Sequence, residues 1–289
     1  MKNIKKEYIY AIISILLWST TATVTKLLLN NLNRLQVLFV TSTFASLFLL
    51  IINIFKKNLK QLKSLRIRDY IQLALIGLLG TFLYTLFFYI GINKMQASQA
   101  FIINYLWPIM SVVFACIILK EKVTLKKFLA IIISFIGVLI VTSNGNIFNI
   151  SSNSLIGSIY CILAAVAYGL FTVLNKKVKY DTFLSMMLFY FSSAIVSLIY
   201  IIITKNWISI EITQFAGLIW LGFFTSAIAF TSWAIALEKG NTAKISNLAY
   251  ITPFLSLIWT SIVLKETVSI YSLIGLVVII LGVLIQLKD

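Results

Sequence analysis

Long apolar runs recur along almost the whole chain and are separated by short polar connections. A helix needs about 20 consecutive apolar residues to cross a bilayer, and the runs match that length. Hardly any of the chain is left outside them, so a large water-exposed domain is not expected. We predict ten membrane-spanning helices, at residues 8–29, 35–55, 70–92, 97–119, 125–141, 155–175, 183–203, 215–237, 243–264 and 270–287.

The composition excludes a soluble protein and most enzyme chemistry. Hydrophobic residues make up 61% of the chain, charged residues only 11%, and the mean hydropathy is +1.02. The chain has no histidine and two cysteines, which argues against a histidine-based triad, a histidine-ligated metal and a disulfide framework. A lipid-modifying enzyme would need a nucleophile, a base or a metal at the membrane surface. We therefore expect no catalytic residue, no metal site, no cofactor and no enzyme activity.

The distribution of positive charge along the chain indicates the membrane topology and does not point to a polyanionic partner. The formal net charge is +16. Of the 24 lysine and arginine residues, 19 fall on alternate connections, on the same side as both termini. Short cytoplasmic loops carry such an excess, so we expect both termini in the cytoplasm and a multi-pass protein of the cytoplasmic (inner) membrane. Membrane lipids are the expected partners, and nucleic acid is not.

The second half of the chain repeats the first at an offset of 145 residues. Pro108 then lies over Pro253, and Leu119-Lys120-Glu121 over Leu264-Lys265-Glu266. Five predicted helices per half is an odd number, which places the halves in opposite orientations, as in many secondary transporters. We expect two inverted five-helix repeats, 1–143 and 155–289, joined by an extracytoplasmic linker, 144–154, and a mechanism of alternating access.

These features resemble those of the drug/metabolite transporter superfamily, EamA family. The resemblance rests on LLWSTTATVTK at 16–26, a proline in the fourth helix of each half, the LKE turn after it, and GVLI closing each half. NYLWP at 104–108 with LLWST at 16–20 is similar to the aromatic amino acid exporter branch. This resemblance implies a transporter that exports amino acids, with aromatic ones among the candidates, or related small metabolites.

Polar and aromatic residues well inside the apolar runs are the candidate substrate contacts. Aromatic walls with a few amide and hydroxyl groups suit a partly apolar solute with polar ends. Each aromatic residue could instead belong to an interfacial belt or face lipid, and each asparagine could join two helices. The candidates are Trp18, Tyr84, Phe88, Asn104, Tyr105, Trp107, Tyr168, Trp233, Asn247 and Tyr250.

Two prolines and four glycines have other expected roles. Pro108 and Pro253 each remove a backbone hydrogen bond from the fourth helix of a half, and their paired positions predict hinges. Gly77 and Gly222, and likewise Gly137 and Gly282, occupy equivalent positions in the halves. We expect these glycines to be points of close helix packing and not substrate contacts.

The acidic residues all lie at or beyond the ends of the predicted helices. A proton or sodium relay usually needs an ionisable group inside the membrane. We therefore expect exchange or uniport of a small molecule down its gradient without such a relay, or coupling through the ionisation of the substrate itself. Efflux of amphipathic drugs or dyes is the alternative that the same aromatic lining allows. The sequence leaves open the substrate, the direction of transport and the oligomeric state, for which a monomer is one option.

Overall fold

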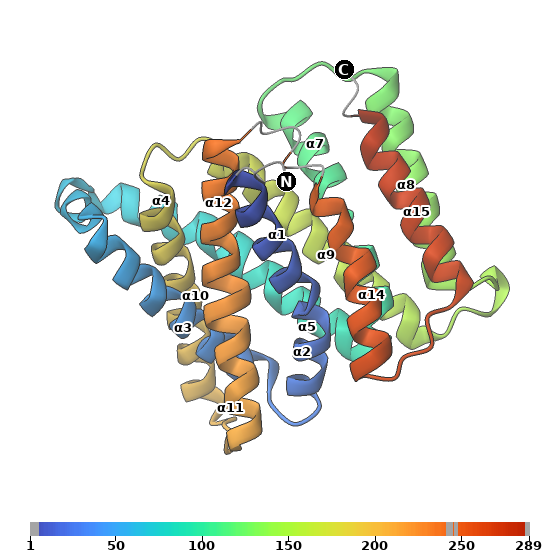
Figure 1. The fold of residues 1–289 in the computed structure, drawn as a ribbon, viewed down its shortest axis with the longest axis horizontal. Helices are drawn as coiled ribbons and strands as arrows, with labels where there is room; N and C mark the ends of the chain where they lie inside the picture. Colours follow the sequence, from blue (N-terminus) through green and yellow to red (C-terminus); the bar gives the residue numbers. More distant parts are fainter. Residues whose placement is uncertain (1–5, 241–244, 246–247, 287–289) are drawn as a thin grey trace, which may run out of the picture. The chain divides into compact units, whose positions relative to one another are not determined.

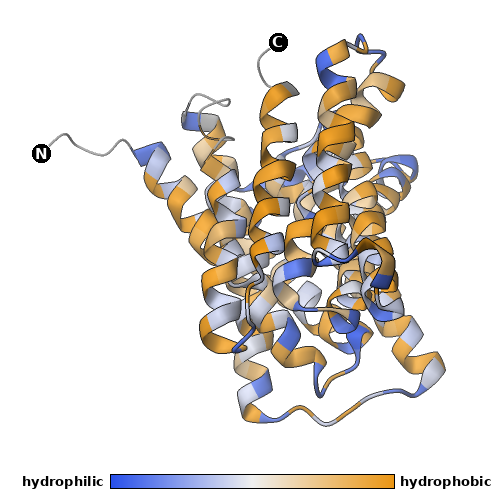
Figure 2. Ribbon diagram, turned by 90° about the vertical axis from the view of Figure 1, so that its right-hand side faces the viewer, coloured by the Kyte–Doolittle hydropathy of each residue, from blue (hydrophilic) through white to orange (hydrophobic). Residues whose placement is uncertain are grey.

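The computed structural model describes residues 6–240, 245 and 248–286, and these form helices without any strand. Eight helices are long and apolar enough to cross a membrane, and shorter apolar helices cover Ala249–Val263 and Ile270–Ile285. Each of these segments overlaps one of the apolar runs of the sequence. Hydrophobic residues run along the helices, while hydrophilic ones gather at their ends (Figure 2). The chain is an all-α integral membrane protein.

The chain divides into two compact units that do not follow the two halves of the sequence. Unit 1 contains Met1–Phe82 and Lys179–Trp259, and unit 2 contains Leu83–Val178 and Thr260–Asp289. Each unit therefore combines segments of both halves. One division falls within a continuous span, between Phe82 and Leu83, and another falls within the helix that begins at Thr252.

Unit 1 is built from helices that pack in pairs (Figure 1). Helix α1 packs on α12, α3 packs on α10 and on the π-helical segment η4, and α4 also packs on α10. The bounds of its elements are α1 Lys6–Ser19, α2 Thr21–Leu29, α3 Arg34–Phe55, η1 Asn58–Ser64, α4 Ile67–Gly77, α10 Thr182–Thr204, α11 Ile212–Ile219, η4 Trp220–Ile228, α12 Ala229–Lys239 and η5 Ala249–Ile251, followed by the start of α14 Thr252–Val263.

The first apolar run is interrupted at Thr20, between α1 and α2. The Ser19 hydroxyl donates to the Leu16 carbonyl and the Thr20 hydroxyl to the Leu17 carbonyl, each at 2.7 Å. Such local bonds compete with the helix ladder, which explains why a continuous apolar run gives two helices. A second irregularity follows α4, where Leu78–Leu83 is π-helical (η2). π-helical segments inside α-helices occur frequently at functional sites.

Unit 2 is built around α9, which packs against α5, α6 and α7, and around the long pairing of α8 with α15 (Figure 1). Helices α6 and α7 share one apolar run, broken just before Pro108, which stands in the first turn of α7. The bounds are α5 Tyr84–Lys94, α6 Ala97–Asn104, α7 Trp107–Ile118, α8 Leu125–Ser143, η3 Ile147–Asn149, α9 Ser152–Asn175 and α15 Ile270–Gln286.

The two LKE turns have the same backbone conformation in unit 2. Lys120 has φ 57° and Lys265 has φ 55°, in the left-handed region. The Glu121 amide donates to the Ala115 carbonyl at 3.4 Å, and the Glu266 amide donates to the Thr260 carbonyl at 3.3 Å. A left-handed residue after a helix commonly terminates it in this way.

The glycines predicted as packing points are confirmed as such. A Cβ added at Gly77 would lie 2.6 Å from Phe189 Cα, and one at Gly222 would lie 2.6 Å from Phe44 Cβ. The partners Phe44 and Phe189 are themselves 145 residues apart, like the two glycines. In the α8–α15 pair, a Cβ on Gly137 would lie 2.8 Å from the Gly275 carbonyl oxygen.

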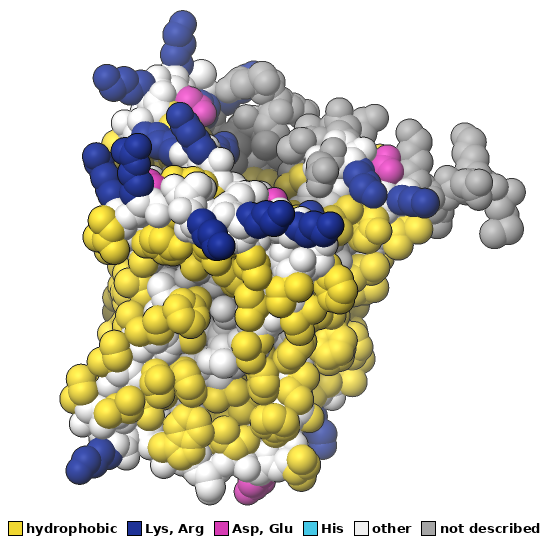
Figure 3. All heavy atoms as spheres, turned by 90° about the vertical axis from the view of Figure 1, so that its left-hand side faces the viewer, with side chains coloured by type: hydrophobic (Ala, Val, Ile, Leu, Met, Phe, Trp, Pro, Cys, Tyr) yellow, Lys and Arg dark blue, Asp and Glu magenta, His cyan; other side chains and the backbone are white. Residues whose placement is uncertain are grey.

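Cationic and apolar side chains separate on the face of unit 1 formed around α3, α4 and α10. Lysine and arginine side chains gather at one end of this face, above a belt of hydrophobic ones (Figure 3). The segment from Lys56 to Arg68, which includes η1, provides exposed cations at the ends of α3 and α4. A belt of this kind fits the hydrocarbon region of a bilayer, and cations fit its polar boundary.

Candidate functional site

A buried tyrosine–asparagine pair is the polar centre of unit 2. The Asn104 side-chain amide donates from Nδ2 to Tyr84 Oη at 3.0 Å. Asn104 is only 3% exposed, and its Oδ1 has no hydrogen-bond partner among the described residues. A buried carbonyl oxygen without a partner is costly, so such an atom is a natural place for a ligand to donate a hydrogen bond.

Helix irregularities hold the two residues of this pair. Tyr84 is the first residue of α5 and follows the π-helical segment η2. Asn104 is the last residue of α6 and precedes the break before Pro108. The break is closed by the Tyr105 amide, which donates to the Ile102 carbonyl at 3.0 Å. Both polar groups therefore lie where the regular helix ladder is disturbed.

Aromatic rings surround the Tyr84–Asn104 pair. The Tyr84 and Tyr168 ring centroids are 4.7 Å apart, and the Trp107 ring meets Tyr168 edge to face at 5.2 Å. Phe88 stacks on Tyr84 at 6.5 Å. These distances lie in the range in which aromatic rings attract one another. The structure thus brings together six predicted contacts within unit 2: Tyr84, Phe88, Asn104, Tyr105, Trp107 and Tyr168.

Two further aromatic residues of this cluster are not among the sequence-based candidates. Phe101 lies 6.3 Å from Phe88 and 5.7 Å from Tyr105, and Phe171 lies 5.5 Å from Tyr168, between ring centroids. Helical spacing is the signal that could have found them, because Phe101 is four residues before Tyr105 and Phe171 is three after Tyr168. Residues at these spacings share one face of a helix.

The remaining described candidates belong to unit 1. The Trp18 indole donates to the Thr225 carbonyl at 3.1 Å, and its ring lies 5.3 Å from Trp233 and 5.1 Å from Phe230. Tyr250 is in η5 and Pro253 is in the first turn of α14. Asn247 lies outside the described residues.

Two tryptophans that are not among the predicted substrate contacts donate hydrogen bonds to side chains at the break between α1 and α2. The Trp220 indole donates to Thr20 Oγ1 at 2.8 Å, and the Trp259 indole donates to Ser19 Oγ at 3.1 Å. The signal for this arrangement was the run of hydroxyl side chains in LLWSTTATVTK. These bonds satisfy the indole donors of two tryptophans that are only partly covered by the protein.

The glutamates of the two LKE turns bind different groups. Glu266 accepts hydrogen bonds from the Ala97 amide at 2.6 Å, the Ser98 amide at 3.0 Å and the Ser98 hydroxyl at 2.7 Å. It therefore caps the first turn of α6, where a negative charge also interacts favourably with the helix dipole.

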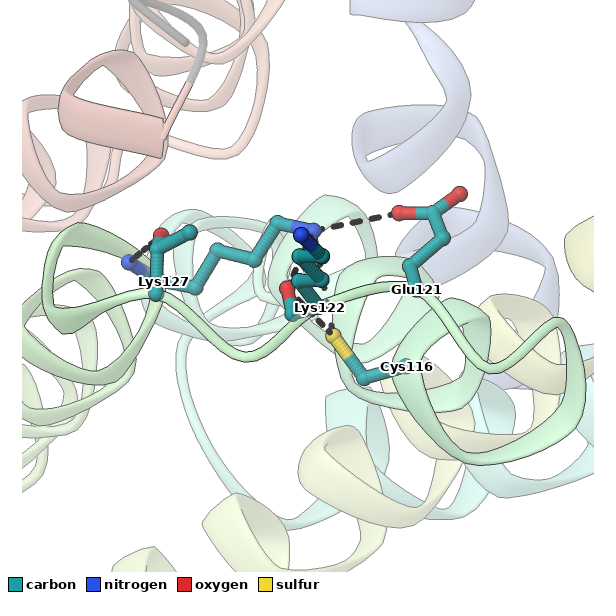
Figure 4. A network of polar contacts seen from close by, with 5 residues as sticks. Cys116, Glu121, Lys122 and Lys127 are labelled. Atoms are coloured by element: carbon teal, nitrogen blue, oxygen red, sulfur yellow. Dashed lines mark hydrogen bonds and ion pairs between the residues drawn. The ribbon is translucent and has the colours of Figure 1, made fainter.

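Glu121 instead forms an ion pair with Lys127 at 3.1 Å (Figure 4). Lys127 also donates to the Lys122 carbonyl at 3.1 Å, and its Nζ lies 3.9 Å from Cys116 Sγ. Glu121 is the more exposed member of the pair, with 45% of its side chain accessible. An exposed pair of this kind contributes roughly 0–1 kcal/mol to stability.

No group of three or more potential metal ligands occurs in the part of the chain that the structure describes. The described carboxylates lie in loops, at N-caps or in the first turns of helices, as Glu7 does in α1 and Asp181 does at the start of α10. The interior of unit 2 around Asn104 thus relies on amide, hydroxyl and aromatic groups.

Helices of membrane-crossing length around an uncharged aromatic and amide centre define a multi-pass membrane protein suited to small-molecule binding. The EamA-like transporter family model matches residues 5–143 and 155–287. The chain belongs to this family and is a transporter, not an enzyme.

Related proteins span nearly the same length. An uncharacterized transporter of Clostridium kluyveri is 27% identical over 98% of this chain and 93% of its own. The uncharacterized transporter YyaM of Bacillus subtilis is 30% identical over 83% of this chain and 80% of its own. One solved crystal structure resembles the fold with a TM-score of 0.70 at 18% identity, covering 97% of this chain and 96% of that one.

Proposed function

We propose that this transporter exports amino acids with apolar or aromatic side chains, or closely related metabolites, across the cytoplasmic membrane. The observation that carries the proposal is the buried Tyr84–Asn104 pair, with its free Asn104 Oδ1, inside a ring of aromatic side chains. The resemblance of NYLWP and LLWST to the aromatic amino acid exporter branch points to the same substrates.

The pair offers one donor and one acceptor to a zwitterion. Tyr84 Oη accepts the bond from Asn104 Nδ2, so its own proton can be donated to a substrate carboxylate. Asn104 Oδ1 can accept from a substrate ammonium group. Each such charge-assisted hydrogen bond is worth about 1.5–3 kcal/mol. The rings of Phe88, Trp107 and Tyr168 then supply apolar surface for the side chain of the substrate.

We further propose that ten helices cross the membrane as two inverted five-helix repeats, with both termini cytoplasmic. Support comes from contacts related by the repeat offset. Gly77 packs on Phe189 and Gly222 packs on Phe44, and each member of one contact is 145 residues from its equivalent in the other. A pseudo-two-fold relation of this kind permits alternating access around one site.

In this proposal Pro108 and Pro253 are the hinges. Pro108 begins α7 after the break at Tyr105 and Leu106, and Pro253 stands at the start of α14 after η5. Each proline stands in the first turn of its helix, where a backbone donor has no partner within the helix, so it removes no intrahelical hydrogen bond, contrary to the expectation from the sequence. The break before each proline is what leaves the span with fewer hydrogen bonds than a regular helix. A segment with fewer hydrogen bonds bends at lower cost.

Counterflow in liposomes that contain the purified chain tests the proposed function. Preloaded unlabelled phenylalanine or tryptophan should drive uptake of the same labelled amino acid, and Asn104→Leu should abolish that uptake. Gln72→Leu, at an exposed position in α4, is the control and should keep it. Amphipathic dye uptake that no amino acid competes for would replace amino acid export with dye efflux.

A further inference from the structure

A polar cavity lies at the Asn144 end of α8, opposite the end at which Lys127 pairs with Glu121. It belongs wholly to unit 2 and has a volume of about 390 Å³. Known sites for small molecules measure roughly 300–1,000 Å³. The cavity is therefore large enough for a small solute such as an amino acid.

The lining of this cavity consists of uncharged hydrogen-bonding groups and one methionine. The carboxamides of Gln96, Gln99 and Asn144 face it together with hydroxyl side chains that include Thr142 and Thr267. A carboxamide supplies both donors and an acceptor, and a hydroxyl supplies both as well. Such a lining fits a solute that has no net charge and carries both hydrogen-bond donors and acceptors.

Gln99 is the central group of the lining. It is only 7% exposed, and its amide has no partner among the residues that the structure describes. A buried side-chain amide normally finds a hydrogen bond in the protein. The Gln99 amide is instead left to the contents of the cavity.

The hydrogen bonds of Glu266 fix the start of α6, and so the position of the Gln96 and Gln99 side chains that line the cavity. Glu266 binds the amides of Ala97 and Ser98, which lie between Gln96 and Gln99 in the chain, and Thr267 directly follows it. Glu266 is thus a positioning residue for the cavity. It attaches the 264–269 connection to the start of α6, so that both sides of this attachment line the cavity.

We infer that this cavity is a second binding site for the zwitterionic head group of the transported solute, an inference that rests on the proposed function. Helix α6 carries both sites. Gln99 and Asn104 are five residues apart, which is about 7.5 Å along the helix axis and about 140° around it. The two sites therefore use different faces of α6 and lie at successive levels along this helix.

Ligand-observed NMR titration of the full chain in lipid nanodiscs tests this inference with glycine as the probe. Glycine has the zwitterionic head group and no side chain for the aromatic cluster. Because the Tyr84–Asn104 pair also offers hydrogen bonds to a zwitterion, the comparison is made in an Asn104→Leu background. There Gln99→Leu should weaken glycine binding at least tenfold, while Gln72→Leu, an exposed glutamine-to-leucine control in α4, should leave it unchanged. Equal glycine affinity with and without Gln99→Leu in this background overturns the inference.

A second arm separates this result from the proposed function. If Asn104→Leu abolishes phenylalanine counterflow but Gln99→Leu leaves glycine binding unchanged, the second site is overturned and the export proposal stands. Glycine binding that depends on Gln99, without any amino acid counterflow, overturns the export proposal and leaves a binding cavity. Gln99→Met, which keeps the side-chain length, should weaken glycine binding as Gln99→Leu does, and thermal melting verifies that both variants are folded.

Discussion

Gly77 packs against Phe189 with no room for a methyl group, because a Cβ at Gly77 would lie 2.6 Å from the Phe189 Cα atom. The obstacle is backbone, so a rotamer change of Phe189 cannot relieve it. Gly222 faces a similar obstacle, since its added Cβ would lie 2.9 Å from the Thr41 carbonyl oxygen. Two glycines, one in each half of the sequence, thus set the approach of α4 to α10 and of η4 to α3.

Gly77→Ala and Gly222→Ala should each destabilise the protein by about 1–3 kcal/mol, the usual cost of overpacking. Gly217→Ala is the matched control, because its added Cβ would meet only the flexible Leu28 side chain, at 3.1 Å. Thermal unfolding in detergent, followed by loss of the monodisperse peak, measures the difference. A melting temperature for Gly77→Ala equal to that of Gly217→Ala would contradict the packing assignment.

Tyr84→Phe should raise the KM for phenylalanine counterflow roughly tenfold with little effect on protein yield, since it removes one hydrogen bond worth about 1–3 kcal/mol from the site. The ring that contacts Tyr168 and Phe88 is retained. Tyr200→Phe, at an exposed position of α10, should leave the KM unchanged. If both variants behave alike, the Tyr84 hydroxyl does not contact the substrate.

Pro108→Ala and Pro253→Ala should reduce the transport rate more than they reduce the amount of folded protein in the membrane. Alanine restores a backbone donor to a helix whose start is irregular, and so it stiffens the predicted hinge. Initial rates normalised to folded protein, taken from size-exclusion profiles, measure the effect. Parallel losses of rate and of folded protein would make these prolines structural only.

Glu266→Gln should lower stability by about 1–3 kcal/mol, because the carboxylate accepts three hydrogen bonds at the start of α6 and a carboxamide cannot keep them all. Glu121→Gln, at the equivalent turn, should cost less than about 1 kcal/mol, since it removes only the exposed pair with Lys127. Melting temperatures of the two variants, compared side by side, check this. The reverse order would show that the α6 cap contributes little.

Amino acid counterflow should continue when a protonophore abolishes the pH gradient. The described carboxylates lie at helix ends and in loops, away from the position that a proton relay would need. Uptake of labelled phenylalanine with and without protonophore measures this. Uphill uptake that requires an imposed pH gradient and stops with the protonophore would show coupling through another group.

Hydropathy predicted where the helices lie, because the bilayer imposes a length and a polarity on every span. The breaks were harder to predict. Pro108 marks the gap between α6 and α7, since proline lacks a donor, but the interruption at Thr20 comes from the hydroxyls of Ser19 and Thr20. The π-helical segment after Gly77 has no such marker, because glycine and leucine fit regular helices too.

The grouping of the candidate residues could not be predicted from apolar character alone. In a membrane protein an aromatic side chain is equally suited to lipid and to the interior, so hydropathy does not reveal which face of a helix is buried. Tyr84 and Tyr168 are far apart in sequence and meet because α5 packs on α9. Trp18 and Trp233 meet because α1 packs on α12, and they belong to unit 1.

The Glu266 cap has a consequence for biosynthesis. The first turn of α6 emerges from the ribosome early, whereas the carboxylate that receives its amide protons comes near the end of the chain. Until residue 266 has been made, those donors lack their native acceptor. The first turn of α6 therefore gains its cap only after most of the chain has been synthesised, and a chain truncated before Glu266 would leave α6 without this cap.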